Sequence, residues 1–89
     1  MHEQAIVRDL VREVNEIARR SGLARVRRVR VWIGPLSHLT EAGLRAAWTD
    51  AARGSVAAGG AISVEVSDDL ADPRAQDVRL VAVEGDDRP

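Results

Sequence analysis

The spacing of apolar residues changes early in the chain from the period of a helix to the period of a strand. Between Gln4 and Arg20 apolar residues recur every three or four positions and charged residues fill the opposite face, which predicts an amphipathic helix. Ser21-Gly22 then predicts its end, because glycine readily takes the left-handed conformation that closes a helix. The apolar face consists of Ile6, Val7, Leu10, Val11, Val14, Ile17 and Ala18.

The rest of the sequence predicts three strands and a second helix. Residues 28–33 alternate between arginine or tryptophan and branched apolar residues, as in a strand with one buried face. Val26 is out of phase with them, so the strand starts late or contains a bulge. Thr40 is placed to cap a helix that ends at Gly54, and strands follow over 61–66 and 78–83. The order helix, strand, helix, strand, strand predicts an α+β fold, with two helices packed on a three-stranded sheet.

The length of 89 residues allows one domain with a modest core. We assign it to residues 1–84, with a surface loop over 67–77 and a disordered tail over 85–89. No apolar run approaches the roughly 20 residues that span a bilayer, so we expect no membrane segment. The N-terminus lacks the basic-then-apolar order of a secretory signal, which predicts a cytoplasmic protein.

The chain has no cysteine, which excludes a disulfide framework, a thiolate zinc site and a cysteine nucleophile. Any metal must therefore be bound through nitrogen and oxygen. Ten arginines and six acidic residues give residues 1–53 a formal charge of +4, and three arginines and eight acidic residues give residues 54–89 a charge of −5. Without Tyr or Phe to stack on bases, the basic part predicts a solvated surface, and we expect no nucleic-acid binding.

The sequence shows no recognisable set of catalytic residues either. Ser37 and His38 are adjacent in a predicted loop, which points their side chains apart, and the sequence identifies no third partner. The glycines from Gly54 to Gly60 lack the ending of a phosphate-binding loop. We therefore predict that the protein is not an enzyme.

The first two residues carry a possible metal site. Met1 and His2 together offer the terminal amine, an amide nitrogen and an imidazole, which are donors that nickel(II) and copper(II) favour. Taken alone, a histidine in second position more often belongs to an exposed terminus that has no function.

Several strings at characteristic separations make the chain resemble the HypA family. These are Met1-His2-Glu3 before the first helix, the strand sequence from Arg28 to Gly34, the helix sequence from Leu44 to Trp48, then Arg53-Gly54-Ser55 and the closing segment from Val81 to Glu84. The resemblance covers residues 1 to about 67 and resumes near 78. HypA proteins are nickel metallochaperones that work with the GTPase HypB to load nickel into the hydrogenase large subunit, and some also serve urease.

This resemblance implies a nickel site at Met1, His2 and Glu3. It also shows two departures from the family pattern. The zinc domain, built on two Cys-x-x-Cys pairs between the second and third strands, is replaced by the 67–77 loop, so no zinc is expected. An acidic residue that the family carries at the start of the second helix is replaced by Thr40, and His38 or Glu41 is the candidate to complete the site.

Two further questions stay open in the sequence. Trp32 is either an interface anchor or a residue packed beneath neighbouring arginine stems, whereas Trp48 lies on an apolar helix stripe and belongs to the core. The function implied by the resemblance is nickel delivery to hydrogenase with a HypB-like GTPase; the alternative is a HypA-derived scaffold that no longer delivers metal. The exposed sheet edge also allows a homodimer.

Overall fold

The computed structural model describes residues 3–89, so the predicted ligands Met1 and His2 lie outside the described residues. The elements are α1 (Glu3–Arg20), β1 (Leu23–Ile33), α2 (Glu41–Ala51), β2 (Ala61–Val66) and β3 (Val78–Asp87). The strands form one mixed sheet of order β2-β1-β3, in which β2 runs parallel and β3 antiparallel to β1. The predicted α+β fold and its order of elements are thus confirmed.

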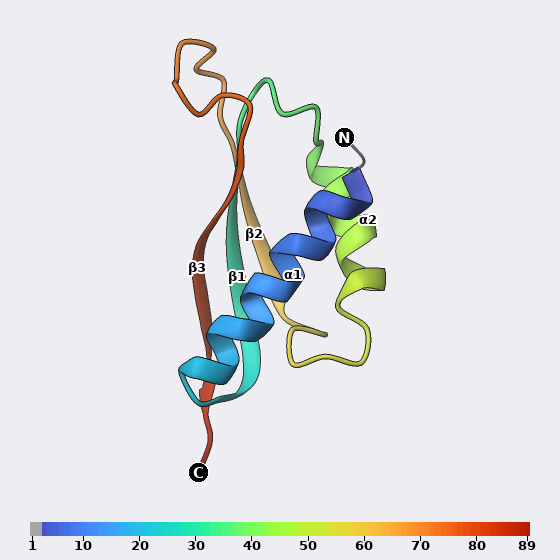
Figure 1. The fold of residues 1–89 in the computed structure, drawn as a ribbon, viewed down its shortest axis with the longest axis vertical. Coiled ribbons are helices and arrows are strands. Elements are labelled where there is room, and N and C mark those ends of the chain that lie inside the picture. Colours follow the sequence, from blue (N-terminus) through green and yellow to red (C-terminus); the bar gives the residue numbers. More distant parts are fainter. Residues whose placement is uncertain (1–2) are drawn as a thin grey trace.

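Both helices lie on the same face of the sheet. α1 crosses β1 and β3 and packs beside α2, which lies over β2 (Figure 1). The core fills the space between these two layers, with Val7 and Val14 of α1, Val29 of β1 and Leu44 of α2 almost wholly removed from solvent. Trp48 is 3% exposed, as predicted for a core residue. Among residues 3–89, no helix covers the opposite face of the sheet.

β1 contains the irregularity that Val26 suggested. The strand starts at Leu23, and its pairing with β3 shifts register at three places, one of them between Val26 and Arg28. These bulges turn Leu23, Val26 and Val29 all toward the helices. The register is therefore reset within the strand, and the alternative of a late start is wrong.

α2 begins as predicted and ends earlier than predicted. The Thr40 hydroxyl accepts a hydrogen bond from the Gly43 amide at 3.0 Å, which confirms the N-cap. The helix stops at Ala51 rather than near Gly54. The Arg53 amide there donates to the Asp50 carbonyl at 3.3 Å, a bond over three residues instead of four that tightens the last turn.

The C-terminal segment is ordered where we predicted a disordered tail over 85–89. β3 continues to Asp87 and pairs with the start of β1, and the Arg88 amide donates to the Gly22 carbonyl at 2.8 Å. The Asp86 carboxylate also lies 3.3 Å from Arg27 and 3.8 Å from Arg25. Backbone pairing and these contacts hold residues 85–87 in place, so that part of the prediction is wrong.

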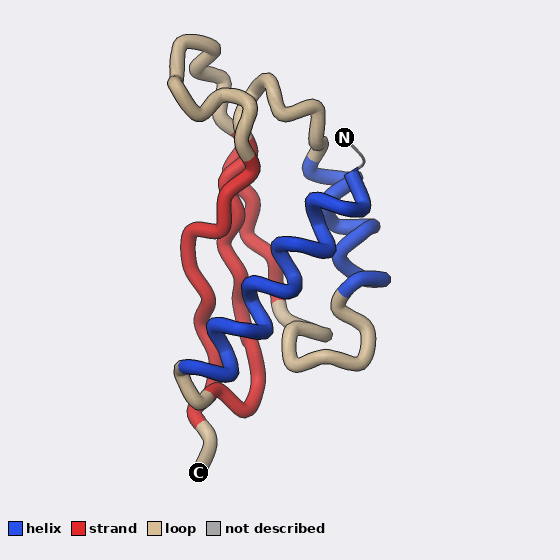
Figure 2. The backbone as a smooth tube through the Cα atoms, viewed as in Figure 1, coloured by secondary structure: helices blue, strands red, loops and turns tan. Residues whose placement is uncertain are grey.

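The loop over 67–77 folds back on the connection between β1 and α2. The Gly34 amide donates to Asp77 and the Leu36 amide to Ala75, at 2.8 and 2.7 Å. The backbone of Ala75 approaches Gly34 so closely that a Cβ there would overlap it. Both loops lie at the same end of the sheet (Figure 2). In residues 3–89, no helix has the length and apolar character needed to cross a membrane.

Candidate metal centre

Two of the predicted ligands meet beside the start of α1. Glu3 opens α1, while His38 lies in the loop that leads into α2, 35 positions further along the chain. Both line a pocket of about 180 Å³, together with Ile6, Ser37 and Leu39. A carboxylate and an imidazole thus border one small cavity, and the carboxylate belongs to the residue that follows Met1 and His2 in the chain.

Glu3 also contacts the first turn of α2. A Cβ built at Gly43 would lie 2.6 Å from the Glu3 carboxyl carbon and 2.7 Å from its Oε2, so the missing side chain of Gly43 makes room for this carboxylate. The positive end of the α2 dipole favours a negative charge at this place. Glycine weakens a helix by about 1 kcal/mol relative to alanine, and at Gly43 it leaves the space that the Glu3 carboxylate occupies.

The local backbone presents His38 to solvent. His38 has a φ of 66°, and it is the non-glycine residue with positive φ in the described chain. Histidine takes this left-handed conformation more readily than most residues, although at some cost in energy. On one side the Ser37 hydroxyl accepts from the Leu39 amide at 3.3 Å, and on the other Leu39 is buried. These neighbours fix the turn and leave the imidazole exposed.

Glu41 is placed differently from the other candidates. Its carboxylate accepts a hydrogen bond from Arg45 Nε at 3.0 Å and lies 2.9 Å from the second guanidinium nitrogen, one helical turn away. It does not line the pocket that Glu3 and His38 share. Within residues 3–89, no group of three or more His, Cys, Asp or Glu side chains is placed to hold a metal ion. The described residues therefore supply two candidate donors, Glu3 and His38, at one place.

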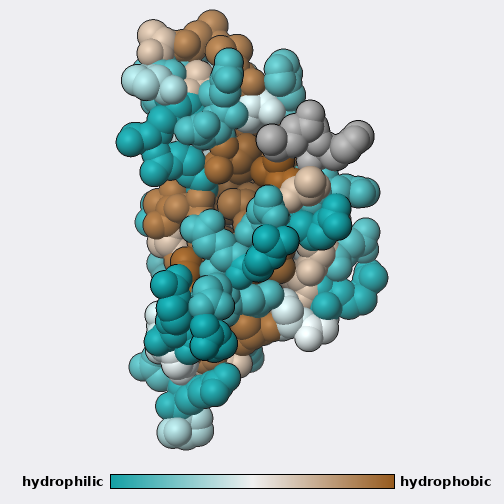
Figure 3. Space-filling model, in the orientation of Figure 1, coloured by the Kyte–Doolittle hydropathy of each residue, from teal (hydrophilic) through white to brown (hydrophobic). Residues whose placement is uncertain are grey.

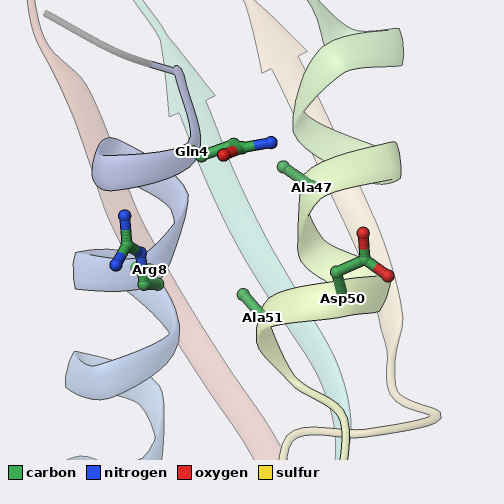
Figure 4. A pocket seen from close by; sticks show the side chains of 5 residues that line it. All are labelled: Gln4, Arg8, Ala47, Asp50 and Ala51. Atoms are coloured by element: carbon green, nitrogen blue, oxygen red, sulfur yellow. The ribbon is translucent and has the colours of Figure 1, made fainter.

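A larger hollow lies between the two helices and has another chemistry. It encloses about 290 Å³ and is lined by Gln4, Arg8, Ala47, Asp50 and Ala51. Figure 4 shows Ala47 and Ala51 facing α1 across the gap, with Gln4 reaching toward α2. The Asp50 carboxylate is paired with Arg53 at 2.9 Å and Arg8 is a cation, which makes a poor donor set for a metal ion, so this hollow is not part of the candidate centre.

Trp32, the predicted interface residue, lies away from this centre. It is half-buried on the face of the sheet that the helices leave open, and it borders a hollow with Arg74 and Arg79. The sequence placed Trp32 on this face correctly. Its role as an interface anchor stays a prediction.

The chain is similar to known proteins over most of its length. A family model described as "Hydrogenase/urease nickel incorporation, metallochaperone, hypA" matches residues 1–72. Hydrogenase maturation factor HypA of Rhodobacter capsulatus is 41% identical over 64 residues, which cover 72% of this chain and 57% of that protein. The chain thus spans a little more than half the length of this relative. These descriptions concern nickel incorporation and maturation rather than catalysis, in agreement with the prediction that the protein is not an enzyme.

Solved structures show the same fold. The solution structure of the Ni metallochaperone HypA from Helicobacter pylori matches with a TM-score of 0.82 at 17% identity, over 99% of this chain and 100% of that one. A second solution structure, of a HypA protein, matches with a TM-score of 0.73 at 18% identity over 96% of each chain. At these identities the likeness establishes the architecture of two helices on a mixed three-stranded sheet.

Proposed function

Because this chain belongs to the HypA family of nickel-incorporation metallochaperones, we propose that it binds nickel(II) at its N-terminus and delivers it during hydrogenase maturation. The observation that supports this most directly is the pocket that Glu3 and His38 share. Glu3 follows Met1 and His2 directly in the chain. The proposed acceptors are a HypB-like GTPase and the hydrogenase large subunit, in the cytoplasm.

The donors at this place suit nickel. The terminal amine of Met1 and the imidazoles of His2 and His38 supply nitrogen, and Glu3 supplies oxygen, which nickel(II) accepts in square-planar or tetragonal sets. Nickel is the cargo here, so the site must also release it. Glu3 and His38 are exposed, and ligands from a terminus and a loop can be displaced one at a time by an acceptor, which favours transfer by ligand exchange.

Titration calorimetry with nickel(II) tests the proposal on protein with an untagged native N-terminus. We expect saturable binding, its loss in His2→Ala, and binding weakened by about tenfold or more in His38→Asn. Asparagine tolerates the left-handed backbone of residue 38, so this variant removes the imidazole and keeps the turn. Glu41→Gln is the matched control, because Glu41 is paired with Arg45 outside the pocket.

Each result has a distinct meaning. A His38→Asn protein that binds like the parent would remove His38 from the ligand set. If Glu41→Gln weakens binding instead, Glu41 leaves Arg45 to serve as the ligand. A parent that binds no nickel would refute the proposal as a whole.

The pH dependence of binding separates the histidines. Protons compete with nickel for imidazole nitrogens, so each histidine ligand makes binding weaker at pH 5.5 than at pH 7.5. Protonation of the terminal amine lowers the affinity as well, by the same factor in every variant. We therefore expect the affinity to fall less in His38→Asn than in the parent over this range. Equal falls would contradict a His38 ligand.

The second candidate function is a HypA-derived scaffold of a hydrogenase assembly that no longer delivers metal. Both side chains at the start of α2 favour it, since the Thr40 hydroxyl caps the helix and Glu41 pairs with Arg45. The same titration decides between the two, because a scaffold requires no nickel binding and a metallochaperone does.

A further inference from the structure

The open face of the sheet has an apolar centre. In the registered pairing, Trp32 of β1 lies between Glu65 of β2 and Arg79 of β3. Val81 is the extra residue where β3 shifts register against β1, and 56% of its surface is exposed. A bulge at this place turns an apolar side chain out to solvent, beside a tryptophan that is only half-buried.

Two hollows meet at this centre. The larger, of about 450 Å³, is lined by Trp32, Leu80 and Val81 together with Asp72, Arg74 and Arg79. The smaller, of about 230 Å³, also borders Val81 and reaches across Arg30 to Glu65 on β2. Both hollows border Val81, so apolar residues lie between the charged residues of the open face.

Three guanidinium groups, of Arg30, Arg74 and Arg79, outnumber the two carboxylates, of Glu65 and Asp72, on the rim. Among the ion pairs of residues 3–89, none involves Arg30, Arg74 or Arg79. Asp72 is less available than they are, because its carboxylate accepts a hydrogen bond from the Arg74 amide at 2.7 Å. An apolar side chain flanked by carboxylates would complement such a surface, since arginine and tryptophan are the residues that most often anchor interfaces.

The same chain carries a segment of that chemistry. The loop over 67–77 displays Leu70 with 66% of its surface exposed, directly after Asp68 and Asp69. A hydrogen bond of 3.0 Å from the Ala71 amide to Asp69 holds this turn. In Figure 3 apolar surface appears at the top of the view, where this loop stands beyond the end of the sheet.

We propose that two copies of this chain associate by placing the Asp68–Leu70 loop tip of each on the open sheet face of the other, around Trp32 and Val81. The Asp68–Leu70 tip is not among the residues that line its own hollow, which the loop borders through Asp72 and Arg74. Bonds from Gly34 and Leu36 hold the second half of the loop at the end of the sheet. A reciprocal exchange about a two-fold axis satisfies both loops and both faces at once. It also brings the acidic C-terminal part of one copy to basic residues of the other.

Sedimentation equilibrium on the full chain tests this arrangement. We expect a concentration-dependent dimer between about 10 µM and about 1 mM, as for other small polar interfaces, and weaker association at about 0.5 M than at about 0.05 M NaCl. Asp68→Lys and Arg79→Glu should each raise the dissociation constant about tenfold or more, because each leaves like charges opposed in both contacts. Glu13→Lys reverses an exposed charge on the helix side and serves as the control, with the parent's dissociation constant.

Mixing the two variants gives the decisive result. In a heterodimer of Asp68→Lys with Arg79→Glu, one contact pairs lysine with glutamate and the other keeps the native pair. Equimolar mixing should therefore restore dimers that neither variant forms alone. A parent that stays monomeric at about 1 mM, or a mixture that stays monomeric, overturns the proposal. So would a synthetic peptide of residues 66–72 that binds while the full chain stays monomeric, because it would assign the face to an acidic segment of another protein.

Discussion

The contact between Glu3 and Gly43 makes a quantitative prediction about stability. Replacing a helical glycine by alanine usually stabilises a helix by about 1 kcal/mol. Here the new Cβ would fall 2.6 Å from the Glu3 carboxyl carbon, so the carboxylate must move off the first turn of α2. Its favourable interaction with the α2 dipole, about 0.3–1 kcal/mol, is then lost. We expect Gly43→Ala to raise stability by less than about 0.7 kcal/mol in the parent.

A double-mutant cycle isolates this effect. In a Glu3→Ala background there is no carboxylate to displace, so Gly43→Ala should yield the full gain of about 1 kcal/mol, or about 4–8 °C in Tm for a domain of this size. Urea and thermal unfolding followed by the fluorescence of buried Trp48 give both free energies. Glu3→Gln separates the charge from the shape of the side chain. Equal gains in the parent and in Glu3→Ala would refute the contact.

The same cycle has a functional readout. If Glu3 is a nickel ligand held in place by Gly43, then Gly43→Ala should weaken nickel binding although it does not weaken the fold. Circular dichroism controls for helix content, and calorimetry measures the affinity. Unchanged nickel affinity would mean that the placement of Glu3 against α2 has no part in the site.

Three further changes test other parts of the structure. Gly34→Ala should destabilise the protein by about 1–3 kcal/mol in urea unfolding, because its Cβ would overlap the backbone of Ala75; an unchanged midpoint would contradict that packing. Thr40→Ala should cost about 1 kcal/mol through loss of the α2 cap, whereas Thr40→Ser should restore it. The hydrogen bond from Arg19 lowers the pKa of Glu16. Glu16 therefore stabilises the folded state at pH values above the ordinary glutamate pKa of about 4.3. This stabilisation is lost as the pH falls through the lowered pKa. Glu16→Gln should accordingly lower Tm slightly at pH 7 and leave it unchanged near pH 2; an equal loss at both would contradict the ion pair.

Local chemistry explains what the sequence determined by itself. The period of the apolar residues fixed α1, and the hydroxyl of Thr40 fixed the start of α2, because these signals act over one or two turns of chain. Strand alternation placed Trp32 on the open face, and the apolar stripe of the second helix placed Trp48 among the core residues. The end of α2 and the extent of β3 were misjudged, since backbone hydrogen bonds, including those from β1, decide where these elements stop.

The candidate centre depended on tertiary structure. Glu3 and His38 are far apart in sequence, and only the packing of α1 against α2 brings them to one pocket. The sequence named His38 and Glu41 as alternatives; the helix then paired Glu41 with Arg45, and the loop placed His38 on the pocket that Glu3 also lines. Likewise, the sequence showed an acidic loop where the family has a zinc domain, but the bonds that anchor it beside β1 arise from contacts across 40 residues of chain. Short-range patterns thus specified the elements, and long-range packing specified which side chains share a site.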